Sequence, residues 1–156
     1  MIRNGRSAIR NVLGAPDTRR PKGARRMVVS PWRSYQRPDS NREFVGLVSY
    51  LPLKGWRGFI RFQRYVRRIR RQLETAEGLV GYSLLARFLE RRFWTFSAWD
   101  DETSLMVFVL SEPHRTAMKE LQPVMGPTKF VRWRVRGSEV PLSWDEGLRR
   151  VESTST

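Results

Sequence analysis

The sequence contains no cysteine and a single histidine, His114, among its 156 residues. The absence of cysteine excludes a disulfide framework, a thiolate metal site and a cysteine nucleophile. One imidazole is too few for any site that needs two histidines, so a structural zinc site is not expected. The sequence therefore predicts no metal site.

Long hydrophobic runs are also missing. No uninterrupted apolar stretch approaches the roughly 18 residues of a membrane-spanning helix. The Arg19-Arg20 pair has no apolar run after it, so it does not fit a twin-arginine signal. We therefore expect a cytoplasmic protein that makes no membrane contact.

Acidic residues are few, with 15 Asp and Glu against 30 Lys and Arg, and the net charge is +15. The excess is concentrated in residues 1–42, which hold 11 Lys and Arg, and in residues 54–72, which hold eight and no acid. The first segment is interrupted by prolines and predicts a basic, flexible N-terminal extension. Met27 is an alternative start, which leaves open whether residues 1–26 belong to the native protein.

From residue 43 the pattern becomes that of a folded domain that ends near residue 137. Apolar periodicity predicts strands over 44–51, 79–89, 93–99 and 129–136, and helices over 56–76, 101–110 and 113–122. We expect Asp100 to cap the second of these helices. Residues 138–156 form a C-terminal extension, in which Ser143 to Glu146 has the spacing of a capping box and predicts a short helix.

The order β–α–β–β–α–α–β predicts an α+β, ferredoxin-like split βαβ sheet with its helices on one face. Strand alternation leads us to expect Tyr82, Leu84, Trp94 and Phe96 on one face, and Leu85, Phe93 and Trp99 on the other. A sheet that is apolar on both faces must bury both. The helices cover one face, so we predict a homodimer in which two sheets meet face to face.

Three stretches resemble a known group of domains. They are residues 78–84 (GLVGYSL), residues 93–101 (FWTFSAWDD) and the pair Phe108-Val109 followed by Pro113-His114-Arg115. Together they are similar to the antibiotic biosynthesis monooxygenase-like (ABM) domains of the dimeric α/β-barrel superfamily, over about residues 43–137. That superfamily includes cofactor-free quinol or polyketide monooxygenases and haem-degrading enzymes. The resemblance implies a pocket for a small aromatic or hydrophobic ligand and no required cofactor.

His114 is the candidate catalytic residue, and Trp99, Tyr82, Thr95, Phe108 and Met118 are the candidate substrate-binding residues. Met118 and Leu121 follow His114 at i+4 and i+7, so the histidine is expected on the apolar side of its helix. A neutral imidazole there can exchange a proton with a phenolic substrate. The alternative is an ordinary packing histidine that bonds one backbone group. Trp99 is equally well explained as a core residue.

Two departures from relatives bear on the chemistry. Some relatives carry asparagine where this chain has Thr95, which weakens the case for monooxygenation. Haem-degrading relatives use a strand asparagine and a helix tryptophan, and Phe108 lies near the expected position of that tryptophan. Haem degradation is therefore disfavoured, while haem binding through His114 stays open.

A row of arginines supports a second hypothesis, in which the protein is a non-catalytic dimer. Arg61, Arg64, Arg68 and Arg71 recur on one face of the first helix, away from its apolar stripe. With the basic extension they could bind nucleic acid or an acidic surface. A solvated outer face explains the same pattern, and we favour it because no known nucleic-acid motif is present. A third hypothesis is a ligand-binding dimer without catalysis.

Overall fold

The computed structural model describes residues 27–154, and its centre is an antiparallel sheet. The four long strands are β3 (Glu43–Pro52), β4 (Leu79–Arg87), β5 (Arg92–Trp99) and β6 (Lys129–Arg136). They lie in the order β4-β5-β3-β6. Two short strands, β1 (Val28–Val29) and β2 (Arg33–Ser34), pair with the outer edge of β4. The four predicted strands are therefore confirmed.

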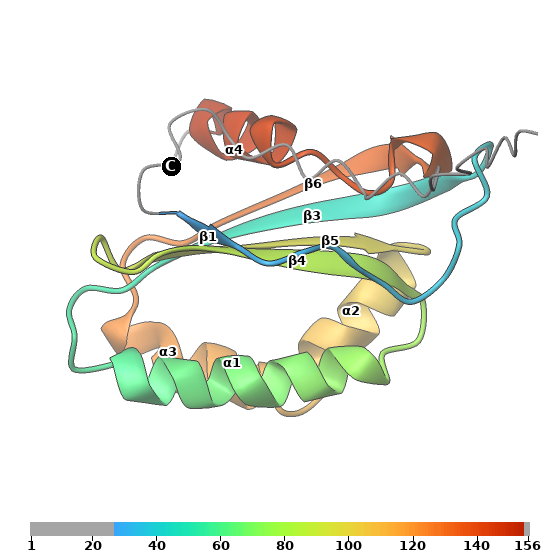
Figure 1. The fold of residues 1–156 in the computed structure, drawn as a ribbon. Coiled ribbons are helices and arrows are strands. Elements are labelled where there is room, and N and C mark those ends of the chain that lie inside the picture. Colours follow the sequence, from blue (N-terminus) through green and yellow to red (C-terminus); the bar gives the residue numbers. More distant parts are fainter. Residues whose placement is uncertain (1–26, 155–156) are drawn as a thin grey trace, which may run out of the picture.

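Three helices cover one face of this sheet: α1 (Phe59–Glu74), α2 (Glu102–Leu110) and α3 (His114–Leu121) (Figure 1). Two 3₁₀ turns, η1 (Gln122–Val124) and η2 (Gly137–Glu139), flank β6. Helix α1 connects β3 to β4, and β5 lies between those two strands. This is the split βαβ arrangement, so the α+β, ferredoxin-like prediction is confirmed. No helix within residues 27–154 has the length and hydropathy needed to cross a bilayer.

Local sequence explains where these helices begin and end. Asp101 caps α2, because its carboxylate accepts a hydrogen bond of 2.7 Å from the backbone N–H of Ser104. The prediction of Asp100 as the cap is wrong by one residue: the Asp100 carboxylate instead accepts from the Gln36 side chain and pairs with Arg42. Gly78 follows α1 with a φ of +77°, a conformation that favours glycine.

The two faces of the sheet carry different residues from those predicted. Leu85 lies opposite Trp94, and Leu84 lies opposite Thr95. Cross-strand partners share a face, so Tyr82 and Leu84 lie with Thr95 and not with Trp94. Phe93 lies two residues before Thr95 and Trp99 lies four residues after it, so both share its face. Alternation within each strand was predicted correctly, but the register between β4 and β5 was wrong by one residue.

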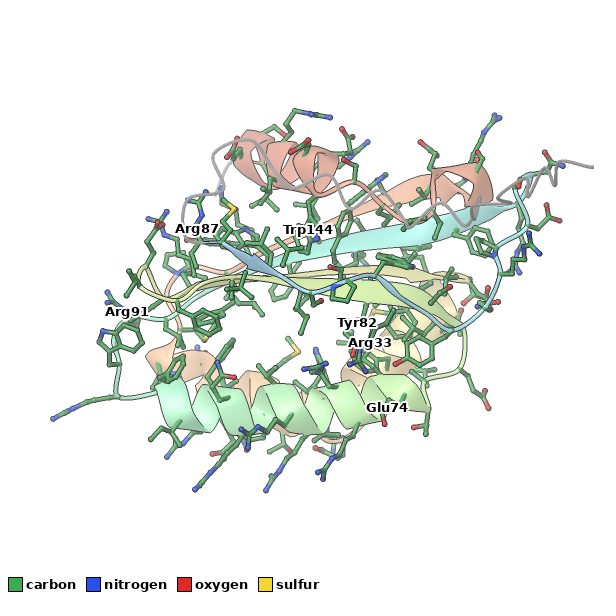
Figure 2. All side chains as sticks on the ribbon, viewed as in Figure 1. Arg33, Glu74, Tyr82, Arg87, Arg91 and Trp144 are labelled. Carbon is green, nitrogen blue, oxygen red and sulfur yellow. The ribbon has the colours of Figure 1, made fainter. Side chains whose placement is uncertain are left out.

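The second face is covered by the chain itself. Helix α4 (Trp144–Ser153) lies on it, and Figure 2 shows Trp144 between that helix and the sheet. Trp144 is 5% exposed and belongs to one buried cluster with Leu85, Trp94 and Phe96. Gly147 permits this approach, since a Cβ there would lie 3.1 Å from the Phe96 ring. The predicted C-terminal helix is confirmed, although Ser143 makes no side-chain cap bond.

Residues 27–34 complete this cover, although they belong to the segment that we predicted to be a flexible extension. Trp32 packs against the buried cluster of Phe44, Val80 and Ala98. The Ser83 hydroxyl donates to the Ser30 carbonyl at 2.8 Å and accepts from the Trp144 indole N–H at 3.0 Å. This part of the predicted extension therefore belongs to the sheet. Residues 1–26 of that segment lie outside the described residues.

The cover removes the argument that led to a homodimer. We inferred a second copy because one face of the sheet seemed to have no partner within the chain. Residues 27–34 and α4 bury that face without one. The homodimer stays a prediction, and its interface would need another surface or a displaced α4.

Replacing Trp144 with alanine tests the cover. Loss of a buried tryptophan costs about 3–5 kcal/mol, so Trp144→Ala should lower the free energy of unfolding by that amount in urea titrations. Glu152→Ala, an exposed change on the same helix, should stay within about 0.5 kcal/mol of the parent. Equal stabilities for the two variants would show that α4 does not seal the sheet.

Candidate active site

The candidate site lies between the sheet and the three helices, where the packing is incomplete. Two buried clusters occupy this layer, one around Trp99 and Phe108 and the other around Phe62 and Phe93. Between them, side chains that face the opposite layer keep part of their surface accessible: Leu47, Val66, Ile69, Leu84 and Thr95. A side chain between packed layers stays accessible only where neighbouring atoms are missing. These five side chains are therefore the part of this layer that a ligand could contact.

His114 borders this region at the start of α3. Its backbone N–H donates to the Gln72 side-chain carbonyl at 3.1 Å, and its Nδ1 lies 3.1 Å from the Val109 carbonyl oxygen. A carbonyl can only accept, so Nδ1 carries the hydrogen. In the neutral ring, Nε2 is then an acceptor with a free lone pair. The position and tautomer suit a base.

Electrostatics keep this ring neutral. Burial lowers the pKa of His114 below its ordinary value of 6.5, and the hydrogen bond to the Val109 carbonyl opposes this shift. The prediction of a neutral ring is therefore supported. Burial is the larger of the two effects.

An aromatic row connects His114 to the sheet. The Phe108 ring lies 5.1 Å from the His114 ring and 5.0 Å from the Trp99 ring, centroid to centroid. Trp99 is only 1% exposed, and its indole N–H donates to the Ser97 hydroxyl at 3.0 Å. The tryptophan therefore supports Phe108 from behind, and its one donor is already used.

The other predicted residues fall into three environments. Tyr82 is buried on the α1 side of the sheet (Figure 2). The Tyr35 ring stacks on it there, with 6.1 Å between the ring centroids. Thr95 lies in the partly accessible centre. Met118 is 48% exposed, because Ala117 and Leu121 are the buried positions of α3. Met118 therefore lies at most at the rim of the candidate site.

Two residues of α1 that complete the site were missed. The Gln72 amide spans the junction of α2 and α3, since its Nε2 donates to the Phe108 carbonyl at 3.0 Å while its Oε1 accepts from His114. Arg70 is partly buried, and its Nε donates to the Tyr82 hydroxyl at 3.5 Å. Position 70 lies four residues after Val66 and three before Leu73, so the apolar stripe could have revealed that Arg70 points inward. No sequence signal marks Gln72.

No metal site emerges from this geometry. Within residues 27–154, no three or more His, Asp or Glu side chains gather in a way that could hold a metal ion. The polar groups of this layer that could take part in proton transfer or hydrogen bonding are His114, the hydroxyls of Thr95 and Tyr82, and the Arg70 guanidinium.

Solved structures share this fold. A protein of Fusobacterium nucleatum, provisionally called a monooxygenase, superposes with a TM-score of 0.59 at 12% identity over 68% of this chain and 48% of its own. SnoaB, a cofactor-independent oxygenase from Streptomyces nogalater, gives a TM-score of 0.50 at 15% identity over 60% and 94%. An antibiotic biosynthesis monooxygenase superposes with a TM-score of 0.52 at 11% identity, over 57% of this chain and 95% of its own.

This chain has the ABM-like fold. Comparisons with protein-family models and with curated proteins find no match. The ABM-like domain matches about half the length of the Fusobacterium protein and of a similar one from Lactobacillus acidophilus. At these identities the likeness establishes the fold and leaves the activity to be inferred from the site.

The lowered pKa of His114 predicts how stability depends on pH. In the unfolded chain the imidazole gains a proton near pH 6.5, whereas in the folded chain it does so only at lower pH. Over that window the unfolded state binds more protons, so the free energy of unfolding should fall as the pH drops below 6.5. Urea titrations from pH 7.5 to 5 should show the fall.

His114→Gln provides the control, because it removes the titrating group and should flatten this part of the profile. The carboxylates with lowered pKa values, Asp101, Glu112 and Glu146, lose their contribution only below their ordinary values of 3.8 to 4.5. An unchanged slope in the variant between pH 6.5 and 5 would show that His114 is not the buried neutral group.

Proposed function

We propose that this ABM-like domain is a cofactor-independent monooxygenase that acts on a small aromatic or polyketide-like substrate. The observation that carries the proposal is His114, a neutral imidazole whose Nε2 is free to accept a proton beside a partly accessible, mostly apolar region. The named activity of SnoaB, a cofactor-independent oxygenase, supports the same class of reaction.

Such a reaction asks little of the protein. His114 Nε2 takes a proton from an acidic C–H or O–H of the substrate, and the resulting anion passes an electron to O₂. A CH₂ group between two conjugated rings is then converted to C=O. One oxygen atom of O₂ enters the carbonyl, and the other leaves as water with both hydrogens. The protein must bind the anion and exclude water while this occurs.

The neighbouring groups fit these requirements. Leu47, Leu84 and Ile69 provide apolar surface for a flat ligand, and the Thr95 hydroxyl can donate to a substrate oxygen. The partly buried guanidinium of Arg70 adds positive charge on the same side of α1 and favours an anionic intermediate. Phe108 packs between Trp99 and His114 and so helps to hold the imidazole in place.

Oxygen consumption with a panel of phenols, quinols and polyketide-like compounds tests the proposal. The wild-type chain should consume O₂ without added metal, flavin or haem, and should show no Soret band as purified. General acid–base catalysis contributes about 10²–10⁴-fold, so His114→Ala should reduce turnover by that factor. The loss should appear in kcat, since the apolar binding surface remains.

Lys119→Ala, an exposed change on the same helix, serves as the matched control and should leave turnover unchanged. Retained turnover in a folded His114→Ala protein would remove the histidine from the mechanism. A Soret band that disappears in that variant would point to haem binding instead.

A further inference from the structure

The outward face of α1 is strongly positive. Nitrogen-tipped side chains point from this helix away from the sheet in Figure 2. Five arginines of α1 are exposed: Arg61, Arg64, Arg67, Arg68 and Arg71. We call this set the α1 arginine face. It lies on the opposite side of the helix from Val66 and Ile69, which face the candidate active site.

The α1 arginines have no carboxylate partners among the described residues. Some exposed arginines in other elements do pair with carboxylates, for example Arg132 with Glu102 at 2.9 Å and Arg134 with Glu43 at 3.3 Å, while others such as Arg33 and Arg136 do not. Among residues 27–154, no α1 arginine takes part in an ion pair. What distinguishes α1 is that five exposed arginines gather on one helix face.

The arrangement also has a cost to the free helix. Like charges at i,i+3 and i,i+4 destabilise a helix by about 0.2–0.5 kcal/mol per pair. The sequence of α1 places six arginine pairs at these spacings, counted as 61–64, 64–67, 64–68, 67–70, 67–71 and 68–71. A bound polyanion would relieve this repulsion.

The dimensions of the face suit a phosphate backbone. Arg61 and Arg71 are ten residues apart, which is about 15 Å along a helix. Each strand of duplex DNA presents a phosphate about every 3.4 Å of helix axis, and an extended single strand spaces its phosphates more widely, so this length spans a few phosphates of a single strand. Just before the helix, Trp56 is 51% exposed; the Arg91 guanidinium lies 5.5 Å from its ring centroid, and the remaining exposed ring surface could stack on a base. Only an unpaired strand leaves its bases free for that contact.

Other polyanions fit less well. A helix that binds a membrane surface inserts an apolar face, whereas the apolar stripe of α1 packs against the sheet, and Ile60 is its one exposed large hydrophobic residue. We propose that the α1 arginine face binds the phosphate backbone of a single-stranded nucleic acid, with Trp56 stacking on a base. This binding is independent of the proposed oxygenase activity.

Fluorescence anisotropy with full-length protein and labelled 12-nucleotide RNA and DNA single strands tests the proposal. The variant Arg64→Gln, Arg67→Gln and Arg68→Gln removes three charges from the face. Each phosphate contact contributes about 0.7 to the slope of log K against log salt. The slope measured for the variant should therefore be shallower by about 2. Its affinity at ~0.1 M salt should be about 100-fold lower. Whichever of RNA and DNA binds more tightly identifies the preferred strand.

The matched control is Arg132→Gln, Arg134→Gln and Arg136→Gln on β6, which removes the same charge from another surface. It should keep the wild-type slope, and because residues 1–26 are present throughout, their charge affects all variants equally. Arg64→Lys, Arg67→Lys and Arg68→Lys should keep most of the binding. Trp56→Ala should weaken single strands about tenfold and duplexes little.

Thermal unfolding shows whether the variants are folded, and the glutamine variant should melt no lower than wild type because repulsion is removed. Four results would overturn the proposal: no binding by the wild type, an equal loss in the β6 control, equally tight α1-dependent binding of poly-glutamate, or tighter α1-dependent binding of vesicles that contain anionic lipid.

Discussion

The structure depends on a sheet that is apolar on both faces and must bury both within one chain. Three helices cover one face, and α4 with residues 27–34 covers the other (Figure 1). To cover the second face, α4 and residues 27–34 must approach the sheet closely, and the polar groups that they bury must be hydrogen-bonded. Gly147 lets α4 approach Phe96, and Gly81 leaves room for Trp32. Ser83 joins both covering segments through hydrogen bonds to Ser30 and Trp144. Each of these features brings a terminal segment onto the sheet.

The two covers differ in completeness, and that difference places the candidate site. Phe96 on the α4 side is fully buried, whereas its strand neighbour Thr95 on the other side stays partly accessible. Helices α1 and α3 close one end of their layer, and α1 and α2 close the other. The Gln72 amide fixes the junction of α2 and α3 and with it the position of His114. The buried side of the sheet thus lies behind the partly accessible side chains of the candidate site.

Periodic elements could be predicted because their signal is local. The alternation of Val131, Trp133 and Val135 predicted β6 with the bounds that the structure has. His114 at the start of α3 and the helix after Ser143 were predicted for the same reason. The register of β4 against β5 could not be, since it depends on the turn and on packing partners. Residues 27–34 form strands too short for any period to appear. Met118 was placed on the apolar side of α3 as the i+4 neighbour of His114, but Ala117 at i+3 is the buried position, and i+3 and i+4 both fall on one helix face.

Helix α1 serves both proposals with opposite faces, and the charges of one face do not reach the other. Burial and the Val109 carbonyl account for the shifted pKa of His114, and no arginine contributes to it. The exposed guanidiniums lie in water, where screening limits their field to about 10 Å at 0.1 M salt. Arg70 is the exception, because it lies at the boundary and contacts Tyr82. A change to the outward arginines should therefore leave the proton chemistry of the site intact, so the two proposals can be tested separately in one protein.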